Sequence, residues 1–238
     1  MKQNYGWTLP EKISVRLGQS SYGRQRALFE DGHLLLVLHN PKLGQVTREA
    51  IVFWRRPDGE WQCNGQGEGL FRLKRFLATY EGYLSELEAE YRSSYSPKLL
   101  FVLLEKLNPL RRAAINSYEA LQSGREMVKL DADIIEARDR AYEIQRSLDL
   151  LFEDVKNRLN FKLAENSEKD AQTNREAVQA QHRLNIMAAI FFPLTALSAV
   201  FSMNLPTGMN AFGASLFWGV FFSGLVGGLF FRGWVLKK

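Results

Sequence analysis

The stretch LNIMAAIFFPLTALSAVFSMNLPTGMNAFGASLFWGVFFSGLVGGLFF, from Leu184 to Phe231, contains no charged residue. Polar groups are costly in hydrocarbon, so a helix that crosses a membrane needs about 20 mostly apolar residues. Roughly 48 uncharged residues are enough for two such helices and a turn. The sequence therefore predicts a membrane hairpin, with a first span at 184–203, an external loop at 204–210 and a second span at 211–231.

Basic residues flank this hairpin on both sides, whereas its loop is uncharged. They are His182 and Arg183 before the hairpin, and Arg232, Lys237 and Lys238 after it. Loops and tails rich in Lys and Arg stay on the cytoplasmic side of a membrane. We therefore expect two spans, membrane lipid as a partner, a basic tail at 232–238, and both termini in the cytoplasm. The N-terminus has no apolar segment of the kind that precedes a signal cleavage site, so we expect no cleavable signal.

The composition of the rest of the chain is that of a soluble domain. The 238 residues carry a net charge of +5 with 24% charged residues and a mean hydropathy of -0.23, and nearly all the charge lies in 1–183. Lys and Arg are interspersed with Asp and Glu, which argues against nucleic-acid binding. The single cysteine, Cys63, excludes an internal disulfide and suits a reducing compartment. No catalytic constellation stands out, so we expect neither an enzyme nor a cofactor.

Residues 1–68 are predicted to form a small β-containing region. His33 to His39 (HLLLVLH) and Ala50 to Trp54 (AIVFW) are short apolar runs typical of strands. The second run is followed by Arg56-Pro57-Asp58-Gly59, a turn in which the proline presets its own φ and the glycine tolerates a positive φ. The alternating glycines of NGQGEG lack the spacing of a dinucleotide-binding loop and are interpreted as a linker.

Residues 69–183 are predicted to be a helical domain that ends in a stalk. A first helix at Leu70 to Arg92 is followed by Ser96-Pro97, which is typical of an N-cap and the first helical position. Asn108-Pro109 repeats that signal, and Gly124 is predicted to be a helix C-cap. From about Leu130 one very long helix is expected to run into the first span. The predicted fold class is α+β, mostly helical, with a stalk helix and a C-terminal membrane hairpin.

The first half of the long helix carries apolar residues at strict steps of three and four. This spacing is typical of a coiled-coil-like helix packed along a narrow seam, inside the chain or between copies. The seam residues are Ile134, Ala137, Ala141, Ile144, Leu148, Leu151 and Val155. The second half, from Ala164 to Arg183, has almost no large apolar residue, so it must bridge solvent or line water together with neighbouring helices.

The same three-and-four spacing continues from this polar segment into the first span and defines one helix face. Most of its members are small or polar, and several carry hydroxyl groups. The face comprises Leu163, Ser167, Asp170, Asn174, Ala177, Gln181, Leu184, Ala188, Phe191, Thr195, Ser198 and Ser202. If several copies stand side by side, this face can line a pore. The alternatives are that its small residues only pack against other helices and that Asp170 is a solvated surface acid.

The end of the first span resembles that of CorA-type divalent cation transporters. The resemblance rests on FPLTALSAVFSMN, from Phe192 to Asn204. Pro193, Leu194 and Thr195 match the family's Pro-Leu-Thr step, and Met203 and Asn204 match the last two positions of its Gly-Met-Asn signature without a gap. The mixed N-terminal domain, the long stalk and the basic C-terminal end agree with the family's layout.

Three departures from the family pattern are present. Ser202 stands where the family has glycine, and an intact Gly208-Met209-Asn210 follows six residues after the first triplet, within the predicted loop. We favour Ser202-Met203-Asn204 as the signature, because this choice keeps the spacing from Pro193 and leaves the first helix a full span. The loop also lacks the acid that family members often carry at the pore mouth, so local enrichment of cations by that route is absent.

The resemblance implies a homopentameric channel for a divalent cation, with Mg²⁺ as the first expectation. Mg²⁺ loses its water reluctantly, so neutral oxygens can select it by hydrogen bonding to the hydrated ion. Asn204 would then contact the hydrated ion at the outer mouth, as part of an ion-selectivity triplet with Met203 and Ser202. Thr195 and Ser198 would pass the ion along, and the bulky Phe191 and Leu184 would form a hydrophobic gate. The remaining expected pore-lining residues are Ala188, Gln181, Asn174 and Asp170, the last as an inner acidic ring.

The family also senses intracellular Mg²⁺ between its cytoplasmic domains. The acids on the long helix that are candidates for this role are Asp131, Asp133, Glu136, Asp139, Glu143 and Asp149, although a charged, solvated helix face explains most of them equally well. In the second span, Gly219, Ser223 and Gly227 are spaced for close helix packing. Two alternatives stay open: a membrane-anchored scaffold that does not transport, and a transporter of Zn²⁺, Co²⁺ or Ni²⁺.

Overall fold

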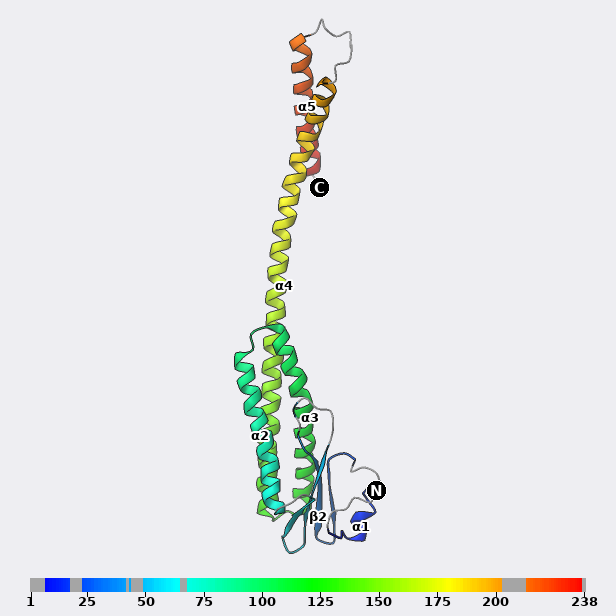
Figure 1. Ribbon diagram of the computed structural model, residues 1–238, viewed down its shortest axis with the longest axis vertical. Coiled ribbons are helices and arrows are strands. Elements are labelled where there is room, and N and C mark those ends of the chain that lie inside the picture. Colours follow the sequence, from blue (N-terminus) through cyan, green and yellow to red (C-terminus); the bar gives the residue numbers. More distant parts are fainter. Residues whose placement is uncertain are drawn as a thin grey trace. The chain divides into compact units, whose positions relative to one another are not determined.

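The computed structural model of the chain describes residues 7–17, 23–41, 43, 49–64, 68–202 and 213–236. The chain divides into two compact units, Met1–Ala164 and Glu165–Lys238 (Figure 1). The first unit contains a sheet and a helical bundle, and the second contains two helices. The predicted fold class is confirmed at the level of a mostly helical α+β chain with a small antiparallel sheet and a long helix.

The sheet has four strands in the order β1-β2-β3-β4, and every neighbouring pair is antiparallel. The strands are β1 (Arg26–Glu30), β2 (His33–His39), β3 (Ala50–Arg55) and β4 (Trp61–Cys63). The two strands predicted from apolar runs are confirmed as β2 and β3, whereas β1 and β4 were not predicted. Asp31 and Gly32 both have positive φ, 48° and 80°, so they form the kind of two-residue turn that matches the twist of a hairpin.

Both faces of the sheet are covered, which explains why β2 is apolar at successive positions. Leu34, Leu36 and Leu38 pack in the core shared with the helices. Leu35 and Val37 face the opposite side, where a short helix, α1 (Glu11–Ser14), contributes Ile13 to a second core. A strand that is buried on both faces cannot show the alternation of a half-exposed strand.

Three helices form the bundle of the first unit, where they lie side by side (Figure 1). They are α2 (Gly69–Ser93), α3 (Pro97–Met127) and the first part of α4 (Ala132–Ser202). Ser96 is the N-cap of α3 and its side chain accepts a hydrogen bond from the Leu99 amide, as predicted. All seven seam residues of α4 are buried in the core, so the seam lies inside the chain.

Two predicted helix ends are wrong. Pro109 lies inside α3, which continues because Leu107, Leu110 and Ala114 around it are buried and hold the helix in place. Gly124 also lies inside α3, which ends at Met127. A Cβ atom on Gly124 would meet the Leu36 side chain at 3.2 Å and the Leu34 side chain at 3.4 Å. This glycine therefore serves the close approach of α3 to the sheet.

The second unit contains the rest of α4 and α5 (Gly213–Leu236). These two helices approach closely at Gly228, where a Cβ atom would lie 3.6 Å from the Ile190 Cα. The contact is therefore made at Gly228, one residue beyond the predicted packing line of Gly219, Ser223 and Gly227, whereas a Cβ atom on Gly219 or Gly227 would meet nothing within 4 Å. Among the residues that the structure describes, no helix has the length and apolar character needed to cross a membrane.

Candidate functional site

The predicted pore-lining face lies on α4 within the second unit. Leu184 and Phe191 are each 61% exposed, and Ala188 is half-buried. The polar members Asp170, Asn174, Gln181, Thr195 and Ser198 are exposed. Residues at steps of three and four share one face of a helix, so α4 brings these side chains into one line. Their role in ion passage stays a prediction.

This face points away from α5. The contact with α5 is made at Ile190, which lies against Gly228. Successive helix residues are rotated by about 100°, so the members of the face from Leu184 to Ser198 are turned by about 80° to 160° from the Ile190 direction. The pairing of α4 with α5 leaves the predicted face uncovered within the unit.

Two hydroxyl groups of this face donate hydrogen bonds to carbonyl groups of their own helix. Thr195 Oγ1 donates to the Phe192 carbonyl at 2.9 Å, and Ser198 Oγ donates to the Leu194 carbonyl at 2.9 Å. A hydroxyl group that donates a hydrogen bond still has oxygen lone pairs that can accept one. Both side chains can therefore accept hydrogen bonds from the water molecules around a hydrated cation.

The outer end of the predicted path is described only in part. Ser202 is the last residue of α4. Met203, Asn204 and the triplet Gly208-Met209-Asn210 lie outside the described residues. The choice between the two triplets as the signature therefore stays a prediction, as does the role of Asn204 toward the metal ion.

The segment of α4 that precedes the apolar stretch in the sequence is exposed on all sides. Every residue from 166 to 185 is exposed, as expected for a helix that is polar all round. Lys169 donates to Glu165 Oε1 at 2.8 Å, and this contact raises the pKa of Lys169. In the described part of the chain Asp170 has no ion-pair partner, so its carboxylate is available to a cation.

Four of the six acids considered for Mg²⁺ sensing are engaged by basic side chains. Asp131 pairs with Arg55, and Asp149 pairs with Arg111. Lys74 Nζ lies 3.1 Å from Glu136, and Arg138 lies 2.9 Å from Asp139. Asp131 also caps α4, because its Oδ1 accepts hydrogen bonds from the amides of Asp133 and Ile134. Only Asp133 and Glu143 are without an ion pair within the described ranges.

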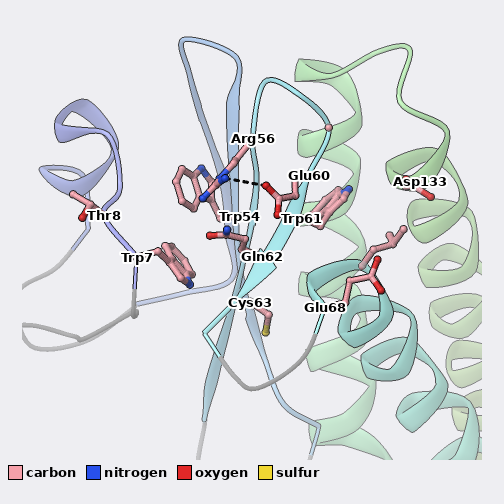
Figure 2. A pocket seen from close by; sticks show the side chains of 12 residues that line it. Trp7, Thr8, Trp54, Arg56, Glu60, Trp61, Gln62, Cys63, Glu68 and Asp133 are labelled. Carbon is pink, nitrogen blue, oxygen red and sulfur yellow. Dashed lines mark hydrogen bonds and ion pairs between the residues drawn. The ribbon is translucent and has the colours of Figure 1, made fainter.

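A second candidate site is a hollow of about 970 Å³ beside β4 in the first unit. Sequence reasoning missed it, because its lining comes from segments far apart in the chain (Figure 2). The side chains that matter here are Trp7, Trp54, Arg56, Trp61, Glu68 and Asp133. Trp7 stacks on Trp54 with ring centroids 5.1 Å apart. In the part of the chain that is described, no cluster of three or more His, Cys, Asp or Glu is placed to hold a metal ion.

Comparison with known proteins gives a fold and no sequence family. No protein-family model matches the chain, and no curated protein matches its sequence. The cytoplasmic domain of ZntB from Vibrio parahaemolyticus RIMD 2210633 is similar with a TM-score of 0.52 at 10% identity, over 67% of this chain and 80% of that one. The full-length CmaX protein is similar with a TM-score of 0.53 at 16% identity, over 97% of this chain and 81% of that one.

A weaker likeness is to the complete CorA magnesium transporter from Methanocaldococcus jannaschii. Its TM-score is 0.44 at 14% identity, over 99% of this chain and 84% of that one. The first two similarities define the class of the fold. This chain has the α+β fold with a long helix that is seen in the cytoplasmic domain of ZntB and in CmaX.

Proposed function

We propose that this protein is an oligomeric membrane transporter of divalent metal cations, and that hydrated Mg²⁺ is the ion it prefers. The observation that carries the proposal is the apolar surface of the second unit. Phe192, Val226 and Phe230 are 72%, 63% and 76% exposed, and they lie in a stretch of sequence without charge. Large apolar side chains that are exposed together on one unit mark contact with a membrane or with other proteins.

The same surface supports a membrane hairpin built from 184–203 and 211–231. Fully hydrogen-bonded helices are the structures that hydrocarbon tolerates, and the α4 and α5 segments are helical. The basic residues on either side, with none in the loop, support an orientation with both termini in the cytoplasm.

In an assembly of several copies, the polar face of α4 would line a central pore. Because this face is turned away from α5, it is free to meet its equivalents in other copies around a common axis. The resemblance to CorA-type transporters implies five copies. Asn204 would ring the outer mouth, Ser198 and Thr195 would accept hydrogen bonds from the hydrated ion, and Phe191 and Leu184 would form a constriction that gates by dewetting. Asp170 would concentrate cations at the inner end.

The test of this pathway is uptake of Mg²⁺ by a transport-deficient host that expresses the chain. Asn204→Ala removes the amide oxygen at the outer mouth, so we expect uptake to fall about tenfold or more, as when about 1.4 kcal/mol of stabilisation of the ion is lost. Asn185→Ala is the matched control, because Asn185 lies off the predicted face. Unchanged uptake by the Asn204 variant at equal expression would show that the assigned selectivity role is wrong.

Two features favour a second candidate, a membrane-anchored scaffold. The loop 204–210 lacks an acid, and Ser202 replaces the glycine of the family signature. A scaffold would insert into the membrane and assemble but would produce no uptake at any Mg²⁺ concentration. Within the transporter class, competition by Zn²⁺, Co²⁺ and Ni²⁺ against Mg²⁺ uptake identifies the preferred ion.

A further inference from the structure

Arg158 of α4 contacts a single residue of α2, Tyr91, through both its charge and a hydrogen bond. The guanidinium carbon of Arg158 lies 3.7 Å from the centre of the Tyr91 ring, and Arg158 Nη1 donates to the Tyr91 carbonyl at 2.9 Å. One turn earlier on α4, the Asp154 carbonyl accepts a hydrogen bond from the Tyr91 hydroxyl at 3.5 Å. Arg158 and Tyr91 are both half-buried, which strengthens a cation–π contact relative to an open surface.

The part of α2 that Arg158 contacts is itself held in place. Tyr91 lies in the last turn of α2, which ends at Ser93, where carbonyl groups lack partners within the helix and a positive charge is favourable. Next to it, Glu90 accepts hydrogen bonds from Lys106 of α3 at 2.8 Å and 2.9 Å. Arg158 therefore attaches α4 to a point that α3 also holds.

This contact lies where α4 leaves the bundle. Val155, the last residue of the buried seam, is 0% exposed, whereas every residue from 166 to 185 is exposed. Arg158 follows Val155 by three residues, so its side chain is turned about 60° from the seam. The contact is thus placed to one side of the seam, at the end of the bundle from which the exposed stalk continues.

The Arg158 contact is directional, whereas the seam is not. Burial of apolar surface does not depend on direction, but a hydrogen bond and a stacked guanidinium group fix both distance and angle. Nearer the start of α4, Arg140 makes a similar directional contact with Glu81 at 2.9 Å. Arg158 adds one beside the stalk, and any rotation of α4 at that point is passed along the continuous helix Ala132–Ser202.

We propose that Arg158 is a positioning residue that sets the rotation of α4 where it enters the stalk. It thereby sets the direction in which the predicted pore-lining face points, although it is not a member of that face. Without the contact to Tyr91, the stalk would sample a wider range of rotations, and the polar side chains of neighbouring copies would meet less often. This inference rests on the proposed function, because it requires that copies assemble around that face.

The experiment is disulfide cross-linking between copies of the full chain in proteoliposomes, in a Cys63→Ser background. Asn174→Cys places a thiol on the predicted face, and Gln172→Cys places one on the same helix about 160° away. We expect dimers to form about tenfold faster from Asn174→Cys than from Gln172→Cys. Adding Arg158→Ala should reduce this preference about threefold or more, as expected for loss of a cation–π contact and a charge-assisted hydrogen bond.

Further variants separate positioning from stability. Tyr91→Ala should reduce the preference as Arg158→Ala does, whereas Tyr91→Phe keeps the ring and should preserve it. Lys156→Ala is the matched control, because the ion pair of Lys156 is with Glu153 on α4 itself, at 3.2 Å.

The melting temperature of each variant is measured alongside its cross-linking. If Arg158→Ala lowers the melting temperature but leaves the preference unchanged, the proposal is overturned and Arg158 serves bundle stability alone. If the two cysteine positions do not differ even when Arg158 is present, the assembly around this face is contradicted, and the positioning role is lost with it.

Discussion

At the scale of single residues, the close approach of the β4 backbone requires a glycine at position 69. A Cβ atom there would lie 2.5 Å from the Gln62 nitrogen and 2.5 Å from the Trp61 carbonyl carbon. Both neighbours are backbone atoms of β4, which cannot move aside as a flexible side chain can. The start of α2 can therefore pack on this strand only if residue 69 has no side chain.

Gly69→Ala is expected to destabilise the first unit by about 1 to 3 kcal/mol through overpacking. Gly82→Ala, in the same helix, is the matched control, because a Cβ on Gly82 would meet nothing within 4 Å. That substitution should stabilise the helix by about 0.5 to 1 kcal/mol. Denaturant unfolding of both variants in detergent measures the change in the free energy of unfolding. If both substitutions change it in the same direction, the assigned contact at Gly69 is wrong.

Tyr80 is a buried titratable residue that makes stability depend on pH. It is 1% exposed, its hydroxyl lies 3.4 Å from Ser117 Oγ, and burial raises the pKa of Tyr80 to about 12. The unfolded tyrosine loses its proton near pH 10. Stability from this group is therefore complete below pH 10 and is lost as the pH rises toward 12, by about 2 to 3 kcal/mol in total.

Tyr80→Phe removes the ionisable group, so the variant should lose less stability than the wild type between pH 9 and pH 12. Near neutral pH the two should differ by about 1 kcal/mol or less, the usual worth of one hydrogen bond. Unfolding curves at a series of pH values measure this. A difference between the two proteins that is the same at every pH would contradict the buried position of the hydroxyl.

At the scale of elements, the seam of α4 carries the packing of the bundle. Leu148 is 0% exposed, whereas Leu150 on the same helix is 59% exposed. Leu148→Ala is expected to cost about 2 to 5 kcal/mol, because it leaves a cavity. Leu150→Ala should change stability by about 0.5 kcal/mol or less. Thermal unfolding of the two variants measures the difference in stability. A similar loss of stability in both variants would show that Leu150 also makes a buried contact.

The elements with a clear period could be predicted from the sequence, and the irregular ones could not. The α4 seam, β2, β3 and the Ser96 cap each carry a local signal, and each is confirmed. β4 has three residues, too few to show an alternation. Gly124 was mistaken for a helix end because a glycine that stops a helix and one that lets a helix approach a sheet look alike in sequence.

The acids at the start of α4 and along it show a second limit of prediction from the sequence. The sequence places them on a charged helix, but their partners come from other elements. Arg55 of β3 reaches Asp131, and Arg111 of α3 reaches Asp149. Removing one partner of a buried ion pair is costly, so Asp131 is tied to the fold. The hollow beside β4 was missed for the same reason, since its lining is assembled only by the tertiary structure.

At the scale of the whole molecule, the proposed function joins a folded α+β unit to an uncharged hairpin. The fold is shared with the cytoplasmic domain of ZntB and with CmaX. The polar face of α4 could be predicted from spacing alone, because all its members lie on one helix. Its orientation away from α5 required the contact between Ile190 and Gly228, which no local pattern reveals.

The most direct test of the central claim is flux of divalent cations into sealed proteoliposomes that contain only the purified chain. With a Mg²⁺-sensitive dye inside and an inward Mg²⁺ gradient, the account predicts a signal that rises with the protein-to-lipid ratio and falls about tenfold or more in Asn204→Ala. Asn185→Ala should match the wild type. Correctly inserted, oligomeric protein that admits no Mg²⁺, Zn²⁺, Co²⁺ or Ni²⁺ above the level of protein-free vesicles would contradict the transporter account and favour the scaffold.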